Sequence, residues 1–353
     1  IVGEEAFMNP ANSKEFTIGY YLSKELGMFD FDFGFRLDQI ERSGSVSEEE
    51  HEDEHGDDHG DEHGDEHGEV DYYNIDDTTS SFAVTLGRSL SDNLDVSLGY
   101  ASFERLPSSI ELFMNGPHMA TGRFEVGDPN LNSETSNNFD VTFNFDNGDF
   151  YAFASFYITD VDNYIALIDE EEEDHMDEDE HHEDEDEHHE DEDEHDDHGN
   201  LIHANYMQKD AEFDGYEIEF GRSFDLGSGE LALSFGRDVV NAEFADGHNV
   251  PRINPARNIY SLVYTQDDLL FKLMLKDVEK QNDFGEGETA TDSYQMLNTR
   301  LTKTFNAIGN GELKVSLFAN NLLDEVARNH SSFVKDEVPL PGRNYGLKFN
   351  LTF

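Results

Sequence analysis

The sequence contains no cysteine and no tryptophan, and no apolar run approaches the length of about 18 residues that a membrane-spanning helix needs. Without cysteine, disulfide frameworks and thiolate metal sites are excluded. The chain begins at Ile1, with no start methionine and no signal peptide, so we expect a mature form or a fragment.

Positive charge is scarce, because 22 Lys and Arg stand against 81 Asp and Glu, giving a formal net charge of −59. Such a chain repels phosphate backbones, so nucleic acid is excluded as a partner. Much of the charge is local. A first tract, residues 48–69, carries 13 acids and a second, residues 169–198, carries 22, with no Lys or Arg in either. The two tracts also hold 12 of the 16 histidines, and without their acids the net charge would be −24.

Outside the tracts, apolar and polar residues alternate with a period of two, and helical periodicity is hard to find. Phe29, Phe31, Phe33 and Phe35 alternate with polar residues or glycine, and the final residues repeat the pattern up to Phe353. Successive side chains of a strand point to opposite faces, so each such segment predicts a strand with one apolar face. We expect about thirteen strands, over 15–25, 28–42, 72–90, 93–103, 135–146, 149–168, 204–224, 230–244, 256–267, 269–282, 292–306, 311–321 and 343–353.

The predicted strands are long, and their connections alternate between tight turns and long segments. Several strands reach ten or more residues, which suits a tilted strand that crosses a bilayer in about 9–11 residues. The alternation puts every tight turn at one rim and every long loop at the other, as in outer-membrane barrels with short periplasmic turns. A soluble acidic β-sandwich is the alternative, but it rarely keeps strict hairpin alternation with such long strands. The fold class predicted is all-β, a transmembrane antiparallel up-and-down β-barrel.

Two stretches carry a family resemblance. FERLPSSIELFMNGPHMATGRFEVGDPNLNSETSNNFDVTF (103–143) contains Pro–Ser–x–x–Glu–Leu, Gly–Pro–His–x–Ala–Thr and Glu–x–Gly–Asp–Pro–x–Leu. NNLLDEVARNHSSFVKDEVPLPGRNYGLKFNLTF (320–353) contains Asn–Leu–Leu–Asp, Arg–Asn–His–x–Ser–Phe and Leu–Pro–Gly–Arg–Asn. Both resemble TonB-dependent outer-membrane receptors, and the Arg–Asn–His–Ser–Ser–Phe form with His-rich loops is similar to the zinc-associated branch of that family.

The resemblance implies a plugged barrel of about 22 strands in the outer membrane. Residues 1–353 would then be the C-terminal part of the barrel, with neither the N-terminal plug nor the TonB box in this sequence. Residues 43–71 and 169–203 would be His/Asp/Glu-rich extracellular loops. The implied partners are outer-membrane lipid, the TonB complex through the missing N-terminal region, and a metal cargo.

The composition of the tracts predicts metal capture. Neutral imidazole is the commonest zinc ligand, and carboxylates supply the remaining positions, whereas calcium would need the acids alone. Glycine at every fourth position of the first tract disfavours a helix, so we expect a chain that wraps around cations. The predicted ligands in the tracts are His51, His55, His59, His63, His67, His175, His181, His182, His188, His189, His195 and His198. Zinc is the expected metal, and copper, nickel or cobalt stay open. An inert solvated run is the alternative.

Four histidines lie outside the tracts, and His118 and His330 have the better claim as metal ligands because they fall within the matched motifs. His203 and His248 are weaker candidates, as are the nearby oxygens of Glu125 and Asp128. Arg105, Arg123, Arg328 and Arg343 are expected to be charge partners at the rim or in the lumen.

No sequence context for hydrolytic, phosphate-binding or zinc-protease chemistry is found, so the chain is not expected to be an enzyme. Import of zinc or a zinc complex is the predicted function. The alternatives are a receptor for a metallophore or haem, and an extracellular cation-binding barrel without transport.

Overall fold

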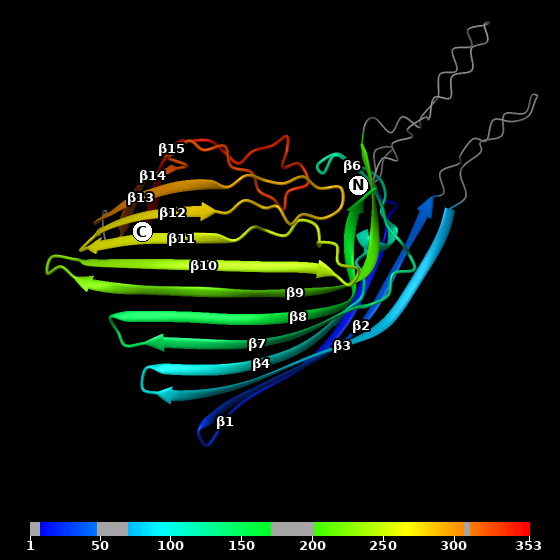
Figure 1. The fold of residues 1–353 in the computed structure, drawn as a ribbon, viewed down its shortest axis with the longest axis horizontal. Helices are drawn as coiled ribbons and strands as arrows, with labels where there is room; N and C mark the ends of the chain where they lie inside the picture. Colours follow the sequence, from blue (N-terminus) through cyan, green and yellow to red (C-terminus); the bar gives the residue numbers. More distant parts are fainter. Residues whose placement is uncertain (1–7, 48–69, 171–200, 307–310) are drawn as a thin grey trace, which may run out of the picture.

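The computed structural model describes residues 8–47, 70–170, 201–306 and 311–353, which form one curved, almost entirely antiparallel sheet with a single short helix (Figure 1). Its elements are β1 (Asn12–Leu26), β2 (Phe29–Ser47), β3 (Val70–Ser91), β4 (Leu94–Arg105), α1 (Ser109–Phe113), β5 (Asn115–His118), β6 (Arg123–Val126), β7 (Glu134–Asp146), β8 (Phe150–Asp169), β9 (Ile202–Asp225), β10 (Glu230–Phe244), β11 (Arg257–Gln266), β12 (Leu269–Val278), β13 (Tyr294–Asn306), β14 (Glu312–Asn320) and β15 (Asn344–Thr352). In the parts of the chain that the structure describes, no helix is long and apolar enough to cross a membrane.

All thirteen predicted strands are present, and each long strand pairs antiparallel with its neighbour along the chain. The boundaries differ slightly: β2 continues to Ser47 rather than ending near residue 42, and β12 ends at Val278 rather than near 282. Beyond β12 the chain leaves the ladder, because Gln281 bridges to Thr291 within the next loop. Among the described residues, the outermost strands of the pairing order, β1 and β15, do not pair with each other.

The predicted alternation of connections is confirmed. Short turns join β1 to β2, β3 to β4, β7 to β8, β9 to β10 and β11 to β12, and they lie together at the left of Figure 1. The long connections all leave the opposite end of the sheet, which we call the long-loop end.

The strand register assigns every side chain to one of two faces. Leu317 lies directly opposite Leu301 on one side and Leu347 on the other, and these positions continue an apolar surface that we call the outer face. Farther along the sheet, aromatic rings follow one another on this face, with Phe220 and Tyr260 each about 5 Å from Phe235 between ring centroids (5.3 and 5.1 Å). The alternate positions form the polar inner face, as expected for a barrel with lipid outside and a wet interior.

At the long-loop end, apolar residues of the connections pack on the inner face. Val250 packs with Ala242 and Phe244 of β10, and Ala327 of the last loop packs with Val278 and Tyr294. The loops before β11 and before β15 therefore fold inward over this end of the sheet.

The connection between β4 and β7, which sequence periodicity treated as a loop, contains α1, β5 and β6. The helix is capped reciprocally: the Glu111 amide donates to Ser108 Oγ (3.3 Å) and the Ser108 amide donates to Glu111 Oε2 (2.6 Å). Elements of four or five residues are too short to show a period, so only the Ser–x–x–Glu capping pattern could have indicated the helix.

Candidate functional site at the long-loop end

Both tracts connect strands at the long-loop end. The first follows Ser47 at the end of β2, and the chain returns at Val70 at the start of β3. The second begins at Asp169, the last residue of β8, and the chain returns at Ile202 at the start of β9. The twelve predicted tract histidines lie outside the described residues. The strand ends that carry the tracts are described, and their surroundings can be built up residue by residue.

The segment from α1 to β6 packs against the strand ends that carry the first tract. The side-chain amide of Asn115 donates to the carbonyl oxygen of Ser47 at 2.8 Å. The fully buried ring of Phe113 stacks on Tyr73 with centroids 6.3 Å apart. Gly44 allows this approach, since a Cβ there would lie 2.4 Å from the Phe113 ring.

The same segment also holds the strand ends that carry the second tract. β6 pairs in parallel with the start of β9, so that Arg123 lies opposite Ile202. The Arg123 guanidinium forms a bidentate ion pair with Asp169, the last residue of β8, at 2.6 and 2.5 Å. Both side chains are buried, at 7% and 4% exposure, which gives the pair little competition from solvent. We call residues 107–126 the strut. This single segment of about 20 residues contacts the strand ends that flank both tracts.

His118, one of the predicted ligands, lies on the strut. Its Nδ1 is 2.8 Å from Glu125 Oε1, and the Thr121 hydroxyl donates to the same oxygen at 2.7 Å. The Glu125 side chain is 3% exposed, whereas that of His118 is 37% exposed. His118 and Glu125 together offer one nitrogen and one carboxylate.

His330 lies in a different, fully buried cluster that joins three loops. Its Nδ1 is 3.1 Å from the Thr291 hydroxyl, and its Nε2 is 3.8 Å from Glu288. The Lys335 ammonium is 3.7 Å from the same carboxylate. A divalent cation at this place would meet the ammonium charge, so the geometry favours a structural role for His330.

Hydrogen bonds and nearby cations keep Glu288 ionised in this cluster. Burial acts to raise its pKa, but His330, the backbone amides of Arg252 and Gly285, and Lys335 together hold the pKa at about 2. The amides donate to Glu288 Oε2 at 2.9 and 3.0 Å. Glu288 is thus an anionic centre shared by the loops before β11, before β13 and before β15.

The remaining predicted residues have local partners. His203 stacks on Phe124 (5.3 Å between ring centroids), and His248 Nδ1 lies 3.3 Å from Asp246 in an exposed turn. Asp128 accepts the amide of Asn130 at 2.8 Å within a turn. No group of three or more metal-ligating side chains occurs within residues 8–47, 70–170, 201–306 and 311–353.

Four arginines were expected to be charge partners at the rim or in the lumen. Three of them pair with carboxylates: Arg105 with Glu111 and Glu134, Arg123 with Asp169, and Arg343 with Asp324. Arg328 instead donates to the backbone carbonyls of Lys335 and Asp336.

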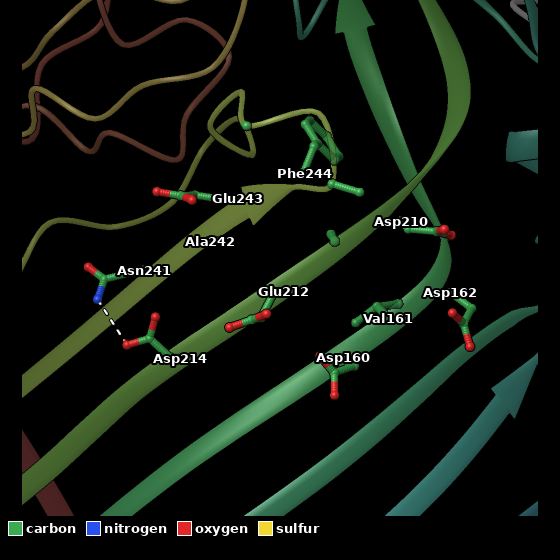
Figure 2. Close-up of a pocket in the computed structure, with 13 residues that line it drawn as sticks. Asp160, Val161, Asp162, Asp210, Glu212, Asp214, Asn241, Ala242, Glu243 and Phe244 are labelled. Atoms are coloured by element: carbon green, nitrogen blue, oxygen red, sulfur yellow. Dashed lines mark hydrogen bonds between the residues drawn. The ribbon is translucent and has the colours of Figure 1, made fainter.

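Sequence reasoning missed an acidic hollow of about 580 Å³ on β8, β9 and β10 (Figure 2). Asp160, Glu212 and Glu243 lie directly opposite one another on the three strands, and Asn241 donates to Asp214 at 3.1 Å. The register puts these side chains on the outer face, in line with the apolar positions of the same strands. Their alternation was visible in the sequence, but the cross-strand match was not. Because it faces away from the interior, the hollow is not a candidate for a transport site.

Comparison with known proteins agrees with this architecture. Residues 7–322 match the family described as TonB dependent receptor-like, beta-barrel. Similar solved structures include the copper transporter OprC (TM-score 0.70, 17% identity, 96% of this chain and 48% of that one). The ferric-catecholate import receptor Fiu from E. coli K12 (0.61, 14%, 96% and 44%) and the ferric yersiniabactin uptake receptor FyuA from Yersinia pestis (0.56, 14%, 96% and 45%) are similar as well.

At these identities the structural likeness establishes the fold, and the chain spans about half the length of the receptors it matches. The family match covers most of the sequence and agrees with the strand order, the alternating connections and the two-faced sheet. The chain therefore belongs to the family of TonB-dependent receptor-like β-barrels.

Proposed function

We propose that this chain is the barrel portion of an outer-membrane receptor that imports zinc or a zinc complex, driven by TonB coupling. Away from the acidic hollow, the outer face is largely apolar and the inner face is polar, which supports insertion in a bilayer with lipid outside. The long-loop end would then be extracellular, and the two tracts would meet metal in the medium.

The observation that carries the proposal is the combination of tract composition and tract position. Twelve histidines with 35 acids occur in two segments that connect strands at the same end of the sheet. Both segments begin and end where the strut contacts the sheet, and the strut carries the His118–Glu125 pair. In our proposal the tracts raise the local metal concentration, and His118 with Glu125 contributes ligands near the mouth.

Zinc is proposed over calcium because histidine adds nothing to a calcium site. Copper is the main rival among free ions, since it outbinds zinc at most nitrogen and oxygen sites and OprC is described as a copper transporter. Titration of the whole receptor with Zn²⁺, Cu²⁺, Ni²⁺ and Ca²⁺ would rank the ions. A preference for Ca²⁺ would contradict the role given to the histidines.

A chelated metal is the second candidate cargo. Fiu and FyuA are described as receptors for ferric catecholate and ferric yersiniabactin, so an organic metal complex or haem fits the same fold. Uptake of free ⁶⁵Zn is compared between a receptor-deficient strain and the same strain with the receptor restored. This comparison separates a free-zinc cargo from a chelated one. Uptake that needs an added chelator would replace free zinc by a complex. Binding without uptake would favour a cation-binding barrel that does not transport.

A further inference from the structure

The charged residues of the outer face are divided between its two ends. Acids occupy outer positions towards the long-loop end, for example Asp76, Glu104 and Asp277, together with those of the acidic hollow. Within three residues of the short-turn end of each described strand, the register places no acid on the outer face. Four cations lie there instead: Lys24 on β1, Arg88 on β3, Arg222 on β9 and Lys303 on β13.

Three of these four cations have no acidic partner. Lys303 lies 3.7 Å from Asp268 in the turn between β11 and β12. Lys24, Arg88 and Arg222 have no carboxylate oxygen within 4.0 Å in the described part of the chain. In a chain with a net charge of −59, cations without acidic partners are unexpected.

The outer-face cations nearer the long-loop end behave differently. Lys14 pairs with Glu41 at 3.1 Å, and Arg237 pairs with Glu279 at 2.5 Å. The absence of carboxylate partners is therefore confined, among the outer-face cations of the described strands, to the short-turn end.

Arg88 and Arg222 project from apolar surroundings and are exposed. The Arg88 guanidinium lies over the Phe29 ring, 5.5 Å from its centroid, and the Arg222 guanidinium lies over the Phe224 ring at 5.1 Å. Attraction to the face of a ring uses none of the five N–H donors of a guanidinium. These donors remain available for an anion.

The position of the unpaired cations indicates which anion they meet. Each lies two or three residues from the end of its strand, within about 10 Å of the short-turn rim. A charge on the lipid-facing side of a barrel is costly unless it reaches the headgroup level. Phosphate is the anion at that level, and guanidinium groups bind phosphate with paired hydrogen bonds.

The spacing of the cations along the sheet excludes one shared small anion. Four strand steps separate β3 from β9, and four more separate β9 from β13, which is about 19 Å in each case. Separate lipid headgroups, one beside each cation, fit this spacing.

We propose that Lys24, Arg88 and Arg222 bind the phosphates of anionic phospholipids in the leaflet that surrounds the short-turn end. An anionic headgroup is selected because a zwitterionic one already carries an ammonium beside its phosphate. Lys303 contributes less, since Asp268 is close to it. The inference rests on the proposed function only for the placement of the barrel in a bilayer, and it is independent of the cargo.

Fluorescence quenching by lipids with brominated acyl chains tests the proposal in the full receptor. Leu233→Cys, directly opposite Arg222 on the outer face, carries the fluorophore bimane. The receptor is reconstituted in phosphatidylcholine bilayers with increasing amounts of brominated phosphatidylglycerol or brominated phosphatidylcholine. We expect phosphatidylglycerol to bind beside this probe about fivefold more strongly than phosphatidylcholine. Arg222→Gln should abolish the preference, and Arg222→Lys should keep it.

Matched controls separate a local preference from a general one. Arg237→Gln removes an outer-face cation that already has a carboxylate partner, and it should leave the preference at the Leu233 probe unchanged. A bimane at Ile158, opposite Asp214 in the acidic hollow, should show no preference for phosphatidylglycerol. Equal quenching by the two lipids at Leu233, or a preference that survives Arg222→Gln, would overturn the proposal alone. Quenching by neither lipid at either probe would overturn the placement in a bilayer and this proposal with it.

Discussion

The buried pair of Arg123 and Asp169 is expected to be the strongest single link between the strut and the second tract. Arg123→Met would leave the buried Asp169 carboxylate without its ion-pair partner, which costs about 3–5 kcal/mol. The substitution would also remove the hydrogen bond that Arg123 donates to the Thr121 carbonyl oxygen at 2.7 Å. The barrel strands themselves would keep their interstrand hydrogen bonds. The effect should therefore be local opening of β6 from β9.

Hydrogen–deuterium exchange of the whole receptor measures this opening. A loss of 3–5 kcal/mol would accelerate exchange at residues 122–126 and 201–206 by about 100- to 4,000-fold, while exchange in β11–β15 stays the same. Arg123→Met combined with Asp169→Leu should recover much of the protection, because it removes both charges together.

The exposed pair of Arg343 and Asp324, 3.6 Å apart, provides a control. Arg343→Met should change protection by no more than about 1 kcal/mol. Unchanged exchange in Arg123→Met, or a double variant that opens as much as the single one, would refute the reasoning.

Three further predictions concern the strut and the loops. Gly44→Val should displace Phe113 and destabilise α1 by about 1–3 kcal/mol, measured as faster exchange over 109–115, because a Cβ has no room there. Lowering the pH should release the loop before β13, which Glu288 anchors. The pKa of the Glu288 carboxyl is about 2 rather than 4.5. Its contribution to the stability of this loop is therefore complete above about pH 4.5 and is lost as the pH falls towards 2. Glu288→Gln should abolish that pH dependence in exchange measured from pH 2 to 6. His118→Gln should weaken zinc binding to the full receptor with barrel assembly unchanged on heat-modified gels, and equal affinity would remove His118 from the site.

The long strands were predictable because each carries its own period-two pattern and needs no distant information. The prediction for β10 matched its observed bounds, 230–244. The ends of β2 and β12 were less accurate, since they depend on where neighbouring loops begin to bridge. The position of all long loops at one end of the sheet could be predicted because short and long connections alternate along the chain.

The surroundings of the candidate ligands could not be predicted from sequence. The pairing of His118 with Glu125 depends on the short β5–β6 hairpin, which has no period to reveal it. The ammonium of Lys335 near His330 depends on how one loop folds back over another. The cross-strand match of Asp160, Glu212 and Glu243 depends on strand register, which a sequence gives only once the turn geometry is known.

The most direct test of metal capture is ⁶⁵Zn uptake at limiting zinc by a receptor in which the seven histidines of residues 171–198 are changed to Gln. This variant keeps every acid of the second tract and leaves Asp169 paired with Arg123, so it removes the imidazoles alone. We predict that uptake falls several-fold at scarce zinc and is normal at abundant zinc, with the same amount of folded barrel in the membrane. Uptake equal to that of the unaltered receptor at scarce zinc would contradict the account.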